Sequence, residues 1–455
     1  MAKAWHQWIP QPLRARLTSR ASLRKILVNT IWLFMDRALT TLISVVIGAW
    51  VARHLGPAEW GKLGYAASFT GLFLVFATLG LDEIVIRAIV RKDAPQENIL
   101  GTAFILRLIA AITTYIIVAV LIWQIESDLQ IRALVLIAAG NLILQPFNVI
   151  ELWFQSRVES KYVVWVKNAT LLLISGLKII LIFGQMPVIA FGWTALLWQI
   201  MIAIGLLLMF SRYGPRMIAW RIQWSLGWAL LKDAWPLIIA GLAASIYMKI
   251  DQVMLGSMLG SSAVGIYAVA VRLSELWRFL PIALAASLFP AIVRTRESQE
   301  QTVYKKRLQA FYDVMVGLAF AIALLMTLLA PFLVSTLFGP QYADSTAILQ
   351  THIWALVFVS LVVARNKGLL VENRTRFVMV ATSLGAAANV ILNYWLIPRY
   401  SGMGAAWATI ISYVVSGYLS CLLSRELWPL FKQLTLSLLL PFRLRSVLSA
   451  IKEVI

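Results

Sequence analysis

The stretch WPLIIAGLAASIYMKIDQVMLGSMLG (residues 235–260), followed by SSAVG (261–265) and IYAVAVRLSELWRFLPIALAASLFP (266–290), decides the fold class. Two apolar segments flank a short Gly/Ser turn, and each is long enough to cross a bilayer, which takes about 20 mostly apolar residues. Both carry charge well inside them: Lys249 and Asp251 in the first, and Arg272, Glu275 and Arg278 in the second. A charge at the bilayer centre costs roughly 2.5–3.5 kcal/mol unless it is paired or faces water. The hairpin is therefore expected to line a polar cavity between helices.

The composition predicts a polytopic membrane protein. The 455 residues are 61% hydrophobic and 13% charged, with a mean hydropathy of +0.82, whereas soluble domains are about 45–50% apolar and 25% charged. The single cysteine, Cys421, excludes a disulfide framework and a thiolate metal cluster. The histidines His6, His54 and His352 lie far apart without ligand spacing, and His352 is expected to be a packed or hydrogen-bonded residue.

Apolar segments of spanning length recur along the whole chain. We predict twelve membrane spans, at residues 26–52, 63–86, 100–124, 132–154, 162–183, 188–210, 235–259, 266–290, 308–330, 346–364, 377–397 and 405–424.

The basic residues between these spans alternate in number and predict the orientation. One set of joining segments carries 28 Lys and Arg residues and the other carries 3. Because cytoplasmic loops are enriched in Lys and Arg, both termini are expected in the cytoplasm. The same distribution argues that the net charge of +20 reflects membrane orientation and not nucleic-acid binding.

The spans divide into two halves. The expected organisation is a cytoplasmic N-terminal tail (1–25), a lobe of helices 1–6 (26–210), a basic, Trp-rich interfacial linker (211–234), a lobe of helices 7–12 (235–424) and a cytoplasmic C-terminal tail (425–455). The halves echo each other, since LGPAEWG (55–61) and LGSSAVG (259–265) follow the first spans of the two halves and place glycines five residues apart. Six spans per half predict parallel repeats related by an axis along the membrane normal.

Several charged residues lie deep in the predicted spans and are the candidate functional residues. Arg272, Glu275 and Arg278 step by three along one side of a helix. One interpretation is a set of interhelical salt bridges. The other is a hydrated cavity with excess positive charge that suits an anionic ligand, because Arg and Lys both bind phosphate. The cavity cations would be Arg37, Lys249, Arg272 and Arg278, and the ion-pair or coupling acids would be Asp36, Asp251 and Glu275.

Motifs of common catalytic sites are missing from the sequence. There is no Walker A loop, no GxSxG elbow and no metal-spaced His/Cys cluster. An ATPase in this chain alone is not expected, nor is a cofactor or a metal, so transport would draw on an ion gradient, a partner or the substrate's own gradient.

The chain resembles the Wzx-type oligosaccharide-lipid flippases, which share a superfamily with the MATE drug antiporters and the lipid II flippases. The resemblance runs through NTIWLFMDRALTTLISVVIGAWVARHLGPAEWGKLGYAASF (29–69), ATLGLDEIVIRAIVRK (77–92), the 235–290 hairpin, FGPQYADS (338–345) and ANVILNYWLIPRYSGMGAAWATIISY (388–413).

That resemblance implies an all-α fold of twelve helices in two six-helix lobes, a MATE-like V that opens alternately to each side. It implies transport of undecaprenyl-diphosphate-linked oligosaccharides across the inner membrane through a positively charged cavity, a theme carried here by Arg37, Lys249 and Arg272. The lipid-linked oligosaccharide and membrane lipids are the expected partners, with a polysaccharide polymerase and chain-length proteins as further candidates.

Three other functions remain as alternatives. A MATE-like ion-coupled drug antiporter should have an acidic cavity, whereas cations outnumber acids in these spans. A membrane-bound polysaccharide assembly enzyme should carry a large outer loop with catalytic groups, whereas the longest predicted outer segment, 331–345, is short and nearly uncharged. A scaffold subunit without transport would leave Lys249 and Asp251 unexplained.

Overall fold

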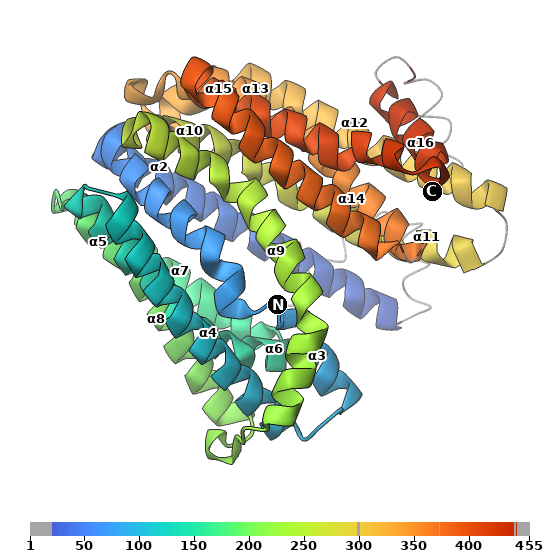
Figure 1. Ribbon diagram of the computed structural model, residues 1–455, viewed down its shortest axis with the longest axis horizontal. Helices are drawn as coiled ribbons and strands as arrows, with labels where there is room; N and C mark the ends of the chain where they lie inside the picture. Colours follow the sequence, from blue (N-terminus) through green and yellow to red (C-terminus); the bar gives the residue numbers. More distant parts are fainter. Residues whose placement is uncertain (1–20, 298–300, 373, 441–442, 444–455) are drawn as a thin grey trace.

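The computed structural model describes residues 21–297, 301–372, 374–440 and 443, and within them it is all-α (Figure 1). The helices are α2 (Ala21–Thr78), α3 (Asp82–Arg91), α4 (Gln96–Ile125), α5 (Leu129–Ile143), α6 (Val149–Ser156), α7 (Lys161–Phe183), α8 (Val188–Tyr213), α9 (Trp224–Leu259), α10 (Ser261–Glu275), α11 (Phe279–Glu297), α12 (Gln301–Leu333), α13 (Ser345–His352), α14 (Ala355–Val371), α15 (Thr375–Gly417) and α16 (Trp428–Leu438).

Every predicted span falls on helical segments of the structure. Eight helical stretches in the described residues are long and apolar enough to cross a membrane, and they hold the predicted spans from 100–124 to 235–259 and from 308–330 onward. The last stretch, Arg376–Leu423, holds two spans. The predicted spans at 26–52 and 63–86 lie in α2 and the start of α3, and the span at 266–290 lies in α10 and α11. The span at 266–290 carries Arg272, Glu275 and Arg278, whose charges lower its hydropathy.

The two longest helices each contain a backbone break where two spans meet. In α2 the break is at Gly56, with φ 75° and ψ 170°, followed by Pro57. In α15 it is at Ser401, with φ 49° and ψ −135°. Gly260, between α9 and α10, has φ 84° and ψ 176°, almost the conformation of Gly56. Positive φ is readily adopted only by glycine. The two echoed glycines therefore make the same turn in the two halves.

The joints predicted to share the outer side meet at one end of the molecule. His54 lies 3.3 Å from the carbonyl oxygen of Met186, and Tyr342 donates to the carbonyl oxygen of Ala52 over 2.8 Å. The joint at 56–61 packs against 261–265 so closely that a Cβ added to Gly61 would lie 1.7 Å from the carbonyl oxygen of Ser261. We call this region, comprising residues 52–62, 126–130, 184–186, 260–265 and 334–342, the closed end.

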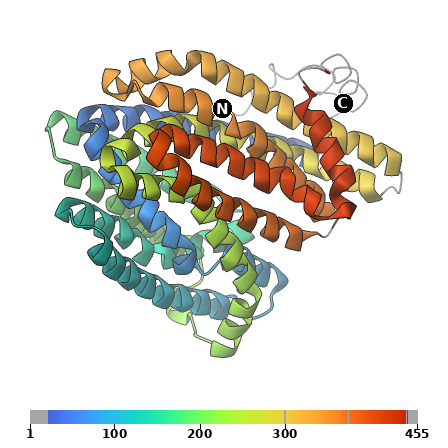
Figure 2. The same cartoon turned by 45° about the horizontal axis from the view of Figure 1, so that its top comes forward.

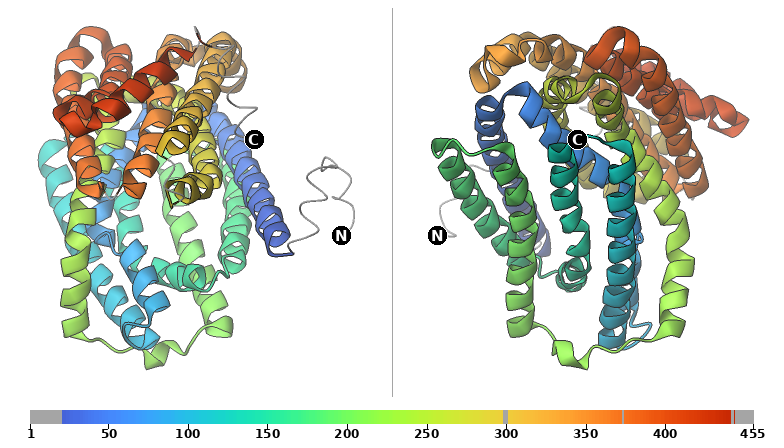
Figure 3. Two further views of the ribbon diagram at one scale, coloured as in Figure 1. Left: turned by 90° about the vertical axis from the view of Figure 1, so that its right-hand side faces the viewer. Right: turned by 60° about the vertical axis from the view of Figure 1, so that its left-hand side comes forward.

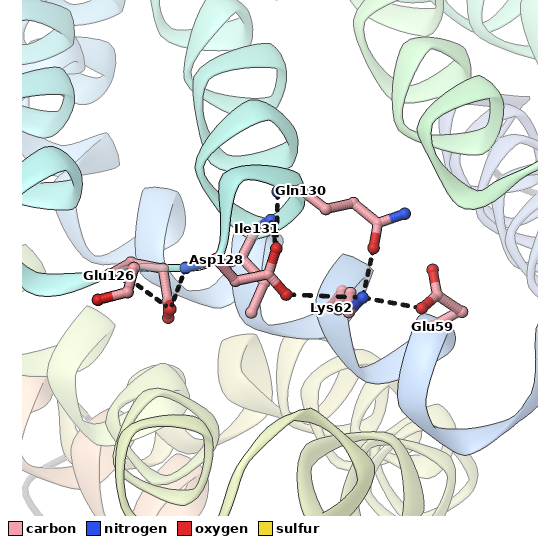
Figure 4. Close-up of polar contacts among 7 residues, drawn as sticks. Glu59, Lys62, Glu126, Asp128, Gln130 and Ile131 are labelled. Atoms are coloured by element: carbon pink, nitrogen blue, oxygen red, sulfur yellow. Dashed lines mark hydrogen bonds and ion pairs between the residues drawn. The ribbon is translucent and has the colours of Figure 1, made fainter.

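Lys62 ties the joint after α4 into the closed end (Figure 4). Its ammonium lies 2.8 Å from the Glu59 carboxylate and 3.7 Å from that of Asp128, and it also bonds Gln130. Asp128 in turn caps α5, because its carboxylate accepts the backbone N–H of Gln130 over 2.7 Å. One lysine thus connects the start of the second span to the start of the fourth.

The helices form two groups that meet at the closed end and diverge away from it (Figures 1 and 3). One hydrophobic core contains residues of both groups near the closed end, such as Tyr65 and Val264, and continues through the second group to Leu434 on α16. Away from it the first group has its own core, formed by α3, α4, α6, α7, α8 and the start of α9. A further core joins α9, α14 and α15 in the second group.

Helix α9 passes from one group to the other, and Figure 2 shows it from a second side. Leu230 and Ala234 are buried in the core of the first group, whereas Ala243 and Tyr247 are buried in the second. Between them lies Pro236, which has no N–H to donate within the helix. The change of partner group therefore falls at the predicted start of the second lobe.

The segment predicted as an interfacial linker, 211–234, contains the end of α8 and the start of α9. α8 continues to Tyr213 and α9 begins at Trp224, so a non-helical connection with one short 3₁₀ turn spans residues 214–223. The residues Gly227, Leu230 and Ala234 recur at helical spacing and are buried, while Trp224 and Trp228 are exposed. An amphipathic helix buries one stripe and exposes the other, which explains both the helix and the Trp-rich composition.

The C-terminal tail contributes a packed helix. α16 lies against α12, where the Ser437 hydroxyl donates to the Asp313 carboxylate over 2.6 Å and Gln309 donates to the same carboxylate over 2.8 Å. Asp313 is therefore buried beneath α16.

Candidate functional site

Two predicted cavity cations contact the broken helix α2 from neighbouring helices of the second group. The stem of Lys249, on α9, lies against Gly71, where an added Cβ would meet the lysine Cγ at 3.6 Å. Arg272, on α10, donates to the carbonyl oxygen of Ser44 over 2.6 Å, and its guanidinium fills the space beside Gly48. Small residues on a membrane helix allow such close approach.

Neither cation forms an ion pair with an acid in the part of the chain that the structure describes, although the charge of Lys249 acts on nearby Asp251. Lys249 makes no hydrogen bond or ion pair there, and Arg272 bonds a carbonyl oxygen and lies over the Trp60 ring at 5.7 Å. Both side chains are half-buried. Because an uncompensated charge inside a membrane is costly, these cations favour a hydrated or anion-binding space over a salt-bridge network.

Arg278 occupies a different site from the other predicted cations. It forms an ion pair with Glu275 over 2.7 Å and lies over the Tyr413 ring at 5.8 Å. Arg272 does not join this pair, so the predicted ladder along α10 is made of one bridge and one separate cation. The 3₁₀ turn Leu276–Arg278 ends α10 there and changes the direction in which Arg278 projects.

The predicted acids Asp251 and Glu275 line a small cavity in the second group. Its volume of about 20 Å³ is enough for roughly one water molecule. Tyr267 donates to Asp251 over 2.5 Å, and Thr409 lies 3.5 Å from the same oxygen. His352 lies on the wall of this cavity and is held by Ser274 over 2.9 Å. The expectation of a hydrogen-bonded His352 is confirmed.

Asp251 does not pair with Lys249. Its carboxylate is satisfied by Tyr267, Thr409 and the backbone N–H of Gln252, at 2.8 Å. The side chains of Asp36 and Arg37 lie outside the described residues, so their predicted roles stay predictions. Within the described residues no cluster of His, Cys, Asp and Glu has the arrangement needed to hold a metal ion.

Arg365 is a buried charge that spacing did not identify. The sequence places it at the edge of a cytoplasmic joint, but the structure buries it completely on α14. It donates to the carbonyl oxygen of Ser416, to the Ser420 hydroxyl over 3.0 Å and to the Asn366 amide oxygen over 2.9 Å. Because α15 ends at Gly417, Ser416 is among the carbonyls at the end of that helix that have no partner within it.

Comparison with known proteins places this arrangement in a family. The profile of the polysaccharide biosynthesis protein family matches residues 26–296, and the MatE profile matches residues 236–395. The probable flippase AglR of Haloferax volcanii is 30% identical over 187 residues, which are 38% of this chain and 37% of that protein. The capsular polysaccharide biosynthesis protein CapF of Staphylococcus aureus is 21% identical over 402 residues, covering 85% of this chain and 96% of CapF.

The fold agrees with the sequence comparisons. The lipid II flippase MurJ in an inward closed conformation superposes with a TM-score of 0.69 at 13% identity, covering 93% of this chain and 95% of MurJ. At that identity the likeness shows the fold alone, and it is a MATE-like fold of membrane helices. The family profile covers more than half of the chain, and the chain therefore belongs to the polysaccharide biosynthesis protein family.

Proposed function

We propose that this protein is a flippase that translocates undecaprenyl-diphosphate-linked oligosaccharide units across the bacterial inner membrane for surface polysaccharide biosynthesis. The membership of the polysaccharide biosynthesis family supports transport of a lipid-linked glycan, and two relatives named as flippase and capsular biosynthesis protein support it further. Both termini lie in the cytoplasm in this proposal, and the closed end faces the periplasm.

The observation that carries the proposal is the pair of cations Lys249 and Arg272, neither of which forms an ion pair with an acid in the described residues. A diphosphate needs charge-assisted donors, and the Arg fork and the Lys ammonium supply them. Both residues contact α2, which packs against helices of both groups, so a bound anion would lie between the groups. Arg37 belongs to the same set in the proposal, and Arg278 serves to hold Glu275.

We assign the coupling of transport to its energy source to the acidic residues Asp251, Glu275 and Asp36. Asp251 and Glu275 line one small cavity with His352, and charge changes there would act on α9, α10 and α15, which move together if the groups rock by alternating access. Asp36, on α2, is the third candidate.

One observation favours a second function. The MatE profile covers residues 236–395, which include the Asp251 and Glu275 cluster, and a MATE-like drug antiporter would use such acids to exchange ions for cationic drugs. The two functions differ in the charge of the ligand, so they separate in one experiment.

The test is complementation of surface glycan in a flippase-deficient strain, normalised to membrane protein level. Lys249→Arg should retain most export, whereas Lys249→Ala and Arg272→Ala should reduce it while the protein still accumulates. The matched control is Lys306→Ala, which removes an exposed cation. A wild-type level of surface glycan with both Ala variants, at normal expression, would contradict the proposed cationic cavity. If the two Ala variants instead lose drug resistance while surface glycan stays at the wild-type level, the antiporter function is favoured.

A further inference from the structure

A second cavity lies inside the first helix group, apart from the Asp251 cluster. It is formed by the second part of α2 with α5, α7, α8 and the 3₁₀ turn Gln145–Asn148 that follows α5, and its volume is about 410 Å³. Ligand pockets of proteins commonly enclose about 300–1,000 Å³. Gly71, against which Lys249 packs, is part of its wall, so the cavity adjoins the cations between the two groups.

The lining of this cavity mixes apolar and polar residues and carries one charge. The charge is Lys178, on α7, and no Asp or Glu is among the lining residues. Lys178 makes no hydrogen bond or ion pair within the described residues, and it is close enough to Arg272 for the two positive charges to repel. An ammonium in this position, without an acid, requires water or an anionic ligand.

The two threonines of the lining donate to backbone carbonyls of their own helices, whereas its three amide side chains keep groups without partners in the described part of the chain. The Asn141 amide oxygen is buried without a donor, and Gln199 makes no hydrogen bond there. Gln145 uses its amide oxygen to accept from Asn148 over 2.7 Å, which leaves its amide nitrogen as a donor. A buried amide oxygen such as that of Asn141 is normally satisfied, and together with the half-buried amides of Gln145 and Gln199 it suits a ligand with several donors and acceptors.

Trp198 adds a flat aromatic surface to the same wall. Aromatic rings pack well against the C–H face of a sugar ring, while amides bond the hydroxyl groups at its edge. A cation then selects a sugar that carries a carboxylate.

We propose that the cavity lined by Lys178, Asn141, Gln145, Trp198 and Gln199 is a saccharide subsite that binds an acidic sugar, such as a uronic acid, of the transported glycan. The inference rests on the proposed flippase function and adds the class of sugar. The diphosphate stays with Lys249 and Arg272, and the acidic sugar enters the first helix group, with Lys178 bonding its carboxylate.

The test measures binding by isothermal calorimetry to the full chain in lipid nanodiscs. Three water-soluble probes are used: a short-chain prenyl diphosphate, the same compound carrying glucose, and the same compound carrying glucuronic acid. The wild type should bind the glucuronyl probe most tightly. Lys178→Gln should weaken the binding of that probe alone by about ten- to a hundredfold, which corresponds to the loss of one charge-assisted hydrogen bond.

Further variants separate a binding role from a structural one. Lys178→Arg should keep the preference for glucuronic acid, and Trp198→Leu should weaken both sugar-bearing probes while sparing the plain prenyl diphosphate. The matched control is Lys167→Gln on the same helix, because Lys167 pairs with Glu151 over 2.6 Å and is not part of the cavity.

The outcomes are distinct. Equal weakening of all three probes by Lys178→Gln would assign the lysine to the diphosphate and overturn the sugar subsite. No preference in the wild type, or no effect of Lys178→Gln, would overturn it as well. A wild type that binds none of the three probes would contradict the proposed function itself.

Discussion

The contact between Gly61 and Gly265 at the closed end offers a direct test of how the two helix groups move. These are the second glycines of the two echoed joints, and each packs against the backbone of the other joint. A Cβ on Gly61 would lie 1.7 Å from the Ser261 carbonyl oxygen, and one on Gly265 would lie 1.9 Å from that of Pro57. Ordinary contact begins near 3.4 Å. Since the obstructing atoms are backbone, Gly265→Ala must push the joints apart by about 1.5 Å.

The cost of this displacement sets the expected magnitude. Overpacking a close contact costs typically 1–3 kcal/mol. If the closed end separates when the transporter opens to the other side, this cost falls on the closed state alone. The equilibrium between the two states should then move toward the open state by about 5- to 150-fold.

The assay is a distance measurement by pulsed electron paramagnetic resonance. Spin labels at Ala58→Cys and Ser262→Cys, both exposed at the closed end, are placed in a Cys421→Ala background. Gly265→Ala should shift the distribution to longer distances. Gly176→Ala is the matched control, because a Cβ there meets nothing within 4 Å. An unchanged distribution in Gly265→Ala, with folded protein and normal transport, would refute the reasoning that this contact closes the molecule.

Three further predictions concern orientation, stability and coupling. Reporter fusions after residues 95, 220, 300 and 370 should report the cytoplasm and those after 58, 128, 262 and 402 the outer side; a reversed result at 220 would break the two-lobe arrangement. Arg365→Met should lower the free energy of unfolding by roughly 2–4 kcal/mol, because it leaves the Ser416 carbonyl and the Ser420 hydroxyl without their charged donor. Thermal unfolding in detergent measures this change, with the exposed Arg376→Met as the control, and equal melting temperatures of the two variants would contradict a stabilising role. Asp251→Asn should slow ion-driven export in proteoliposomes while glycan-probe binding stays within a fewfold of wild type, and an undiminished gradient dependence would remove Asp251 from coupling.

The amino-acid sequence was sufficient to predict the spans and how their ends are distributed. The span positions follow from apolar length alone, because each helix in lipid must satisfy its backbone internally and needs a fixed number of apolar residues. The grouping of the joints at 53–62, 126–130, 184–186 and 260–265 at one end agrees with the alternation of basic residues. The sequence alone showed that Gly56 and Gly260 occupy matching positions in the two halves, and their shared backbone conformation is the physical reason for the match.

Side-chain partners were decided by the tertiary structure. Spacing placed Arg272, Glu275 and Arg278 on one ladder, yet Arg278 takes Glu275 while Arg272 crosses to the Ser44 carbonyl of another helix. Asp251, two residues from Lys249, bonds Tyr267 on α10 instead. Which groups meet depends on the rotation and tilt of packed helices, and the period of one helix carries no information about its neighbours. The cavity around Lys178 likewise exists only because α2, α5, α7 and α8 come together, and no single one of them contains it.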